Sequence, residues 1–363
     1  MMPEAAARSV LEKARRRLML KVSLVFLPEA PMSGAEPTLF ALGATREYGQ
    51  QVAACLGGEL ATHEERAFED GEHKSRPLEG VRGRDVYVLH SLYQDASEGV
   101  NDKLVRLLFF LGALRDAHAG CLTAVIPYLA YARKDRRTKP RDPVTTRYVA
   151  QLLEAVGVDR VLTMDVHNIA AFENAFRVPV VHLEAGALFV RALCRQAGDS
   201  EVVVVSPDAG GYKRAERLRE LLAKQRSSSP GLAFMEKKRS DDVVSGEALV
   251  GEVSGRVAVI VDDLISTGGT LVKAAMACRK AGARAVYAAA THGLFTGAAS
   301  RVLAGAPLER LFVTDTVPPF RLQAEVLQNR VTLVPTAPLL GEAIRRLHTD
   351  GSLSELAEAF CQK

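Results

Sequence analysis

The sequence predicts an α/β fold made of two similar domains in tandem, each a largely parallel β-sheet flanked by helices. Three observations support this prediction. The chain has 363 residues, which suits two domains of ordinary size better than one. Short apolar runs typical of buried strands alternate with amphipathic stretches typical of helices. The same order of segments also occurs twice along the chain.

Seven short apolar runs have the β-branched character of strands that are buried on both faces. They span residues 86–89, 122–126, 160–164, 202–205, 257–261, 285–289 and 311–314. Amphipathic helices are expected between them, for example over residues 102–116 and 270–281. Strands that alternate with helices form parallel sheets covered on both faces, which gives the α/β prediction.

The two halves of the chain resemble each other. The stretch that begins at Val86 resembles the one that begins at Val257, and the residues from Ala41 resemble those from Ser206. All α/β units share part of this pattern, but here the order of strand, loop and helix agrees through both halves. The sequence therefore predicts an N-terminal extension and two domains. Their expected ranges are 1–38, 39–180 and 181–363.

Composition argues against several other classes of protein. Hydrophobic residues make up 48% of the chain and charged residues 25%, which is typical of globular proteins. The 47 Lys and Arg only slightly exceed the 43 Asp and Glu, so no general nucleic-acid-binding surface is expected. No apolar run approaches the length of a membrane span. Five scattered cysteines argue against a zinc site or a disulfide framework and favour a cytoplasmic protein.

A signal peptide is an alternative explanation of the N-terminus. Three arginines precede an apolar run from Leu18 to Leu27, but Lys21 interrupts that run and Glu29 follows it. We therefore expect residues 1–31 to be an extension outside the fold.

The most specific motif lies where the strand over residues 257–261 is expected to end. Asp262 and Asp263 are followed by a loop rich in Ser, Thr and Gly, and then by a helix. Glycines let the backbone approach a phosphate, and a helix N-terminus presents free N–H groups to it. Adjacent carboxylates can accept hydrogen bonds from vicinal sugar hydroxyls, so the motif predicts a sugar-phosphate site; the alternative is an ordinary helix N-cap. The expected phosphate-loop residues are Ser266, Thr267, Gly268, Gly269 and Thr270.

This motif resembles the phosphoribosyl diphosphate (PRPP) loop of the type I phosphoribosyltransferase fold, whose enzymes either consume PRPP or make it. The chain as a whole resembles the ribose-phosphate pyrophosphokinase (PRPP synthetase) family, in unbroken order over roughly residues 39–355. An ordinary phosphoribosyltransferase has one such domain, whereas this family has two, in agreement with the repeat. The segments that carry the resemblance include 101–104, 124–128, 131–136, 162–167, 206–211, 291–293 and 339–348.

The resemblance implies an ATP site shared between subunits; the sequence has no G-x-x-x-x-G-K-[ST] loop for ATP. Phe68, Asp70 and Glu72 match residues that hold the adenine from a neighbouring subunit, although alone they also fit a β-turn with a buried Phe. Lys134 stands where the family usually has glutamine. The basic stretch that contains it also fits a solvated loop or a nucleic-acid contact. The residues that match ATP-binding positions are Arg133, Lys134, Asp135 and His167.

The resemblance also implies a magnesium site and a catalytic loop. His167 and Asp208 match the family's metal site, and so sparse a pair suits Mg²⁺, which keeps waters and phosphate oxygens as ligands. A lone histidine is more often structural. Lys237 and Arg239 match the cations of a mobile catalytic loop, which would stabilise charge during phosphoryl transfer. Without the resemblance they fit a solvated charged loop.

The expected activity is transfer of the diphosphoryl group of MgATP to the C1 hydroxyl of ribose 5-phosphate, which gives PRPP and AMP for nucleotide biosynthesis. A phosphoribosyltransferase is one alternative. A catalytically silent regulatory subunit is another, but such a chain should lose the acid pair or the Lys237 and Arg239 pair, and both are present. The resemblance implies Mg²⁺ as cofactor and a homo-oligomer, a dimer at least and a hexamer by analogy with the family.

Two positions depart from the family pattern. Ser266 stands where the commonest synthetases have an acidic residue. The residues after His167 lack the Ser and Gln side chains of the family's regulatory site, which leaves control by phosphate and ADP open.

Overall fold

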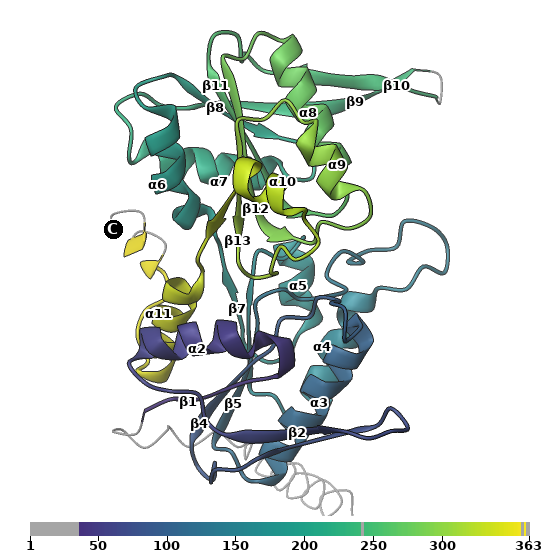
Figure 1. Cartoon of the computed structure of the whole chain (residues 1–363), viewed down its shortest axis with the longest axis vertical. Coiled ribbons are helices and arrows are strands. Elements are labelled where there is room, and N and C mark those ends of the chain that lie inside the picture. Colours follow the sequence, from purple (N-terminus) through teal and green to yellow (C-terminus); the bar gives the residue numbers. More distant parts are fainter. Residues whose placement is uncertain (1–35, 241–242, 357–358, 361–363) are drawn as a thin grey trace, which may run out of the picture.

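The computed structural model describes residues 36–240, 243–356 and 359–360 and shows two α/β units stacked along the long axis of the molecule (Figure 1). The first unit contains a five-stranded sheet in the order β1-β4-β5-β6-β7, whose neighbouring strands are all parallel. These strands are β1 (Thr38–Ala41), β4 (Asp85–Leu89), β5 (Cys121–Ile126), β6 (Arg160–Met164) and β7 (Val180–Leu183). The connecting helices are η1 (Gly43–Thr45), α2 (Arg46–Leu56), α3 (Val100–Asp116), α4 (Thr145–Ala155) and α5 (Ile169–Ala175).

The second unit contains a seven-stranded sheet in the order β10-β9-β8-β11-β12-β13-β14, in which β9 and β10 pair antiparallel and the other neighbours are parallel. Its strands are β8 (Val202–Ser206), β9 (Gly231–Ser240), β10 (Val243–Val250), β11 (Val257–Ile265), β12 (Ala285–Gly293), β13 (Arg310–Thr314) and β14 (Val331–Val334). Its helices are α7 (Tyr212–Ala223), α8 (Gly269–Lys280), α9 (Ala299–Ala304) and α10 (Ala324–Arg330).

The two units repeat one topology, and the α/β prediction is confirmed. The order β1-β4-β5-β6-β7 corresponds strand for strand to β8-β11-β12-β13-β14. Each unit carries an antiparallel hairpin at the same point of the chain. In the first unit, β2 (His63–Ala67) and β3 (His73–Pro77) lie between α2 and β4. In the second unit, β9 and β10 lie between α7 and β11. The runs of valine and other apolar residues that predicted the strands are buried, as expected for parallel strands covered on both faces.

The predicted domain boundary between residues 180 and 181 falls inside a strand of the first sheet. It cuts β7, which pairs with β6 in the first sheet. The helix after the last strand of each unit also crosses to the other unit: α6 (Gly186–Ala197) packs on α7, and α11 (Ala337–His348) packs on α2 (Figure 1). Because α2 and α7 hold equivalent places, the exchange is reciprocal. Sequence order therefore assigns α11 to the second domain, although it packs on the first.

The carboxyl ends of both sheets meet at the junction between the units. The Ser91 hydroxyl, after β4, donates to the carbonyl oxygen of Thr316, after β13, at 2.6 Å. The His292 Nε2 atom, on β12, lies 3.0 Å from the carbonyl oxygen of Met164, on β6. One hydrophobic cluster also joins residues of both units, such as Leu162 and Phe312. Since ligands bind at the carboxyl ends of parallel strands, this junction is the place to look for a site.

None of the described helices combines the length and the apolar character needed to cross a bilayer.

Candidate active site

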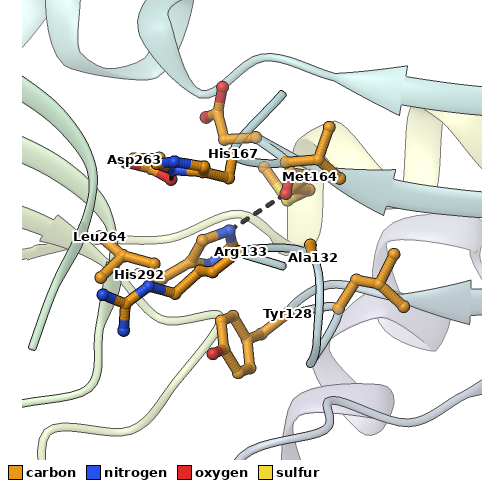
Figure 2. Close-up of a pocket in the computed structure, with 11 residues that line it drawn as sticks. Tyr128, Ala132, Arg133, Met164, His167, Asp263, Leu264 and His292 are labelled. Carbon is orange, nitrogen blue, oxygen red and sulfur yellow. Dashed lines mark hydrogen bonds and ion pairs between the residues drawn. The ribbon is translucent and has the colours of Figure 1, made fainter. Parts of the chain in front are cut away.

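The adjacent carboxylates lie at the carboxyl end of β11. The strand continues through them to Ile265, and Asp262 pairs with Ala290 of β12, so the predicted end of this strand is too early. The Asp263 side chain is buried, and its Oδ2 atom accepts a hydrogen bond from Nδ1 of His167 at 2.8 Å. Figure 2 shows the two side chains next to each other. Because His167 follows β6, this bond joins the two units across the junction.

Arg214, in the first turn of α7, faces both carboxylates and was missed by the sequence analysis. Its Nη1 atom lies 3.7 Å from Oδ1 of Asp262 and 3.6 Å from Oδ1 of Asp263. The signal that could have found it is its place just after Gly211, where the helix after β8 begins at the carboxyl end of the sheet.

The two carboxylates differ in their affinity for a proton. Burial, together with the neighbouring Asp263, raises the pKa of Asp262 well above its ordinary value. Burial also opposes ionisation of Asp263, but the hydrogen bond from His167 and the charge of Arg214 hold the pKa of Asp263 below its usual range. The same hydrogen bond raises the pKa of His167. The fixed negative charge of the pair therefore resides on Asp263.

Asp165 holds the segment that carries His167. Its backbone has φ of +36°, in the region that disfavours side chains other than glycine, so surrounding contacts must hold it there. Its Oδ2 atom accepts hydrogen bonds from the backbone N–H of Ala185 at 2.8 Å and from the hydroxyl of Thr291 on β12. These bonds fix the end of β6 against the start of α6 and against the second sheet.

The loop after β11 leads directly into α8 and has the properties expected of a phosphate cradle. Gly268 has φ of +82°, which glycine adopts without strain. The first turn of α8 carries no acidic side chain, and no described side chain caps it. The Ser266 hydroxyl is held 2.9 Å from the hydroxyl of Thr296. The backbone N–H groups at this helix N-terminus are therefore open to an anion.

The acid pair opens on a cavity of about 1140 Å³ between the units, whereas no residue of the loop over 266–270 is among the described residues that line it. It is lined by the ends of β6 and β11 and by the start of α7. A smaller void of about 10 Å³ lies beside it, lined by Tyr128, Arg133 and His292 among others (Figure 2). Its volume is about that of one water-sized probe. The candidate residues that line the large cavity are Asp135, His167, Asp208, Arg214, Asp262 and Asp263.

His167 and Asp208 are the expected ligands of a divalent cation. Nδ1 of His167 is hydrogen-bonded to Asp263, which leaves Nε2 for a metal; a histidine ligand commonly gives its other ring nitrogen to a carboxylate. Asp208 is exposed, and its Oδ1 accepts the N–H of Gly211 at 2.8 Å. No group of three His, Cys, Asp or Glu side chains is gathered for a metal in the described part of the chain. The pair fits a cation that keeps waters and substrate oxygens as most of its ligands.

Comparison with known proteins decides the family. The family model of the N-terminal domain of ribose phosphate pyrophosphokinase matches residues 37–157, and that of the phosphoribosyl synthetase-associated domain matches residues 226–358. Ribose-phosphate pyrophosphokinase 1 of Streptococcus pyogenes is 38% identical over 331 residues, which cover 90% of this chain and 99% of the relative. The chain belongs to the ribose-phosphate pyrophosphokinase family.

Further relatives agree with this assignment. Ribose-phosphate pyrophosphokinase 1 of Streptococcus agalactiae is 38% identical over 332 residues, covering 90% of this chain and 98% of that one. The crystal structure of phosphoribosylpyrophosphate synthetase from Mycobacterium smegmatis matches with a TM-score of 0.77 and 34% identity. The match covers 87% of this chain and 100% of the Mycobacterium smegmatis chain.

Of the three adjacent candidate residues on the basic stretch, two lie at the site. Arg133 lines the small void, and Asp135 lines the large cavity, where its Oδ2 accepts a hydrogen bond from Asn168 at 2.7 Å. Lys134 differs, because its ammonium group donates to Oδ2 of Asp142 at 2.7 Å within the same loop. A direct role of Lys134 toward ATP would require this ion pair to open.

The hairpin residues expected to hold adenine lie in the turn between β2 and β3. Phe68 is 40% exposed, which excludes a buried Phe at the turn. Its N–H donates to the carbonyl oxygen of Glu72 at 2.8 Å, and Asp70 Oδ1 accepts the N–H of Glu72 at 3.1 Å. Among the described residues that line the large cavity, none comes from this hairpin. The turn is thus exposed and separate from the chain's own cavity.

The proposed catalytic cations lie on β9. The backbone at Lys237 pairs with Glu247 of β10, and that at Arg239 pairs with Val244, so the expected loop is a strand as far as Ser240. The side chains of Lys237 and Arg239 lie outside the described part of the structure. Glu236, directly before them, lines the large cavity, which brings this strand to the site.

Proposed function

We propose that this protein transfers the diphosphoryl group of MgATP to the C1 hydroxyl of ribose 5-phosphate, giving PRPP and AMP. One observation carries the proposal for this member of the family: an acid pair, half-buried at Asp262 and buried at Asp263, and an open helix N-terminus lie side by side at the end of one strand, β11. Acceptors for vicinal hydroxyls next to a cradle for an anion are the two halves of a sugar-phosphate site.

The sugar phosphate would bind across this strand end. Asp262 and Asp263 would accept hydrogen bonds from the ribose hydroxyls, with Arg214 balancing their charge. Backbone N–H groups of the phosphate loop would hold the 5-phosphate. The proposed loop residues are Ser266, Thr267, Gly268, Gly269 and Thr270. This placement leaves the C1 hydroxyl free to face the large cavity.

The nucleotide would occupy the large cavity. His167 and Asp208 would hold Mg²⁺, which when bound would neutralise charge on the triphosphate. Arg133 and Asp135 would meet the ATP phosphates. Lys237 and Arg239 would stabilise the charge that redistributes over the phosphate oxygens as the reaction proceeds.

The proposed reaction needs a positioned acceptor more than covalent help from the protein. The C1 oxygen forms a bond to the β-phosphorus, and the bond from that phosphorus to the oxygen bridging the α-phosphorus breaks. AMP leaves with the bridging oxygen, and the hydroxyl proton is released to solvent. The chain's own contribution is alignment of the two substrates and exclusion of competing acceptors from the junction.

A homo-oligomer would complete the ATP site. We propose that Phe68, Asp70 and Glu72 of one subunit reach the cavity of a neighbour, in a dimer at least and in a hexamer by analogy with the family. Support comes from the exposure of Phe68 and from the separation of this turn from the chain's own cavity.

Incubation with ATP, ribose 5-phosphate and Mg²⁺ tests the proposed function. The expected products are AMP and PRPP in equal amounts, separated by ion-exchange chromatography. Release of ADP would instead indicate an ordinary kinase. Absence of any turnover while both substrates bind would favour the silent regulatory subunit.

A further inference from the structure

Arg321 bridges the two units at a point behind the phosphate loop. It lies between β13 and α10, and its Nη1 atom donates to the carbonyl oxygen of Leu294, just after β12, at 2.8 Å. Its Nη2 atom donates to the carbonyl oxygen of Gln94, in the loop between β4 and α3 of the first unit. The Phe320 ring lies against the guanidinium group, with 4.7 Å between Cζ and the ring centroid.

The segment that Arg321 holds is bonded directly to the start of the phosphate loop. The N–H of Leu294 donates to the carbonyl oxygen of Ile265 at 2.9 Å, and the N–H of Thr296 donates to that of Ser266 at 2.9 Å. The hydroxyls of Ser266 and Thr296 are also 2.9 Å apart. The position of the segment over 294–296 therefore sets the position of Ser266, where the proposed cradle begins.

This segment is strained and depends on its contacts. Phe295 has φ of +45° although it is not a glycine, and its side chain is only 2% exposed. Its ring leaves no room for a side chain at Gly293, where a Cβ would lie 2.3 Å from Phe295 Cε2. Backbone held in such a conformation persists only where surrounding contacts over-determine it. The bond from Arg321 to Leu294 is one of those contacts.

The other end of the bridge is firmly anchored in the first unit. Asp95, which follows Gln94, accepts hydrogen bonds from the N–H groups of Ser97 and Glu98 at 2.8 and 2.9 Å. It also accepts a bond at 2.5 Å from the ammonium group of Lys103, whose side chain is fully buried. Arg321 thus links the phosphate-loop support to a rigid part of the unit that carries His167.

We infer that Arg321 is a positioning residue for the sugar phosphate: it holds the segment over 294–296 in place and thereby the cradle at Ser266. Arg321 reaches the substrate only through that segment. Its loss should weaken binding of ribose 5-phosphate selectively, because Asp208 and His167 are held by other contacts. The inference rests on the proposed function for the identity of the ligand.

The test compares Arg321→Ala with Arg330→Ala. Arg330 is a matched control, because it too donates to two backbone carbonyls, those of Leu308 at 2.8 Å and Ala304 at 3.3 Å, and neither of these residues is hydrogen-bonded to the phosphate loop among the described contacts. Calorimetry measures the Kd for ribose 5-phosphate, and steady-state kinetics measures KM for both substrates. Arg321→Ala should raise the Kd and KM for ribose 5-phosphate by about 3- to 30-fold and change KM for MgATP less than twofold. Arg330→Ala should change neither.

Arg321→Lys supplies a second measurement. A lysine can donate to one of the two carbonyls, so the Kd of Arg321→Lys for ribose 5-phosphate should fall between those of wild type and Arg321→Ala. If Arg321→Ala does not fold, a rise in the Kd of Arg321→Lys for ribose 5-phosphate, without a rise in KM for MgATP, supports the inference. The inference would be overturned if Arg321→Ala and Arg330→Ala raised the Kd for ribose 5-phosphate equally, or if Arg321→Ala raised KM equally for ribose 5-phosphate and MgATP. Failure of the proposed function is distinguishable, since it shows as a wild-type protein that releases no AMP.

Discussion

Nδ1 of His167 lies 2.8 Å from Oδ2 of Asp263, and this bond joins the unit proposed to hold the nucleotide to the strand proposed to hold the ribose. Asp263 thereby has two tasks, as an acceptor for sugar hydroxyls and as the group that orients His167. Asp262 has no such bond to the first unit among the described contacts, although it shares Arg214 with its neighbour. The two aspartates should therefore respond differently to substitution.

Asp262→Asn should affect ribose 5-phosphate alone, whereas Asp263→Asn should affect both substrates. A lost hydrogen bond to a charged group costs about 1.5–3 kcal/mol, or roughly 10- to 150-fold in affinity. We expect a rise of that size in KM for ribose 5-phosphate in Asp263→Asn and a smaller rise in Asp262→Asn, because the negative charge of the pair resides on Asp263. KM for MgATP should rise only in Asp263→Asn, because its amide holds His167 less firmly. Steady-state kinetics with each substrate varied in turn measures this, and identical profiles for the two variants would contradict it.

Lys237→Ala and Arg239→Ala should reduce kcat more than they alter KM. Removing one preorganised donor that acts on transition-state charge costs about 2.7–4 kcal/mol, or roughly 10²–10³ in kcat. Ground-state binding should change much less, since the charge redistributes only as the β-phosphorus is attacked. Lys238→Ala is the control of equal charge on the same strand. A comparable loss at Lys238 would show that the cluster acts only through its general positive charge.

Gly341→Ala should destabilise the protein, whereas Gly112→Ala should not. Gly341 lies in α11, and a Cβ there would stand 2.8 Å from Cβ of Cys55 on α2, at the centre of the reciprocal helix exchange. Overpacking of this kind costs about 1–3 kcal/mol. A Cβ at Gly112, in α3, would meet nothing within 4 Å, so alanine there should stabilise by about 0.4–1 kcal/mol. Denaturant unfolding of the two variants gives opposite shifts if α11 packs on α2 in solution.

The sequence predicts the parts of this fold that depend on local pattern. The strand over 160–164 coincides with β6, because a buried parallel strand is a continuous apolar run. Prediction from the sequence fails where a segment packs against a partner that is distant in the chain. The exchange of α6 and α11 depends on which unit each helix packs against, and amphipathic pattern does not specify the partner. The strand end at 261 was also placed too early, because Asp262 and Asp263 end the apolar run although the backbone pairing with β12 continues from Asp262 to Ile265.

The same limit applies to the candidate site. Adjacent residues such as Asp262, Asp263 and Gly268 form a motif that can be recognised along the chain. Arg214 could not be found in that way, since its contact with the acid pair arises only when α7 and β11 are brought together. Lys134 was expected at ATP, but Asp142 lies eight residues further along and provides a local partner for its charge.

His90 should make the folded protein sensitive to mild acid. The residue is fully buried, and burial together with the charge of Lys103 lowers the pKa of His90 to about 3. The ordinary pKa is about 6.5 in the unfolded chain, so between these values the unfolded state binds a proton that the folded state does not. The contribution of His90 to the free energy of unfolding should therefore fall by roughly 1.4 kcal/mol for each pH unit below 6.5.

The pH dependence is isolated by comparing wild type with His90→Asn. Asparagine can keep a hydrogen bond to the hydroxyl of Thr45, which lies 2.7 Å from Nδ1 of His90, but it does not titrate. Denaturant unfolding between pH 7 and pH 5 should show wild type losing stability relative to the variant. A difference between the two proteins that is constant over this range would mean that His90 takes up its proton in the folded state.

The shared ATP site predicts that two variants, each nearly inactive at substrate concentrations far below its raised KM, restore activity when mixed. Phe68→Ala would remove the hairpin contact that a subunit gives to its neighbour, and Asp263→Asn would disable a subunit's own cavity. Neither change should prevent assembly, because Phe68 is exposed and Asp263 lies between the units of one chain. After unfolding and joint refolding in equal amounts, an intact cavity is paired with an intact hairpin in about one quarter of sites, as random pairing in a symmetric oligomer requires. Activity per subunit should then approach about one quarter of the wild-type value.

A mixture of Phe68→Ala with Glu72→Ala is the control for this experiment. Both changes fall on the same hairpin, so no mixed pair of subunits can supply an intact one, and activity should stay at the level of the separate variants. Light scattering before the assay establishes that the mixed proteins have assembled. If Phe68 served the cavity of its own chain, each subunit of the first mixture would still carry one defect, and no recovery would occur. Recovery to about one quarter in that mixture alone therefore requires a hairpin that acts between subunits.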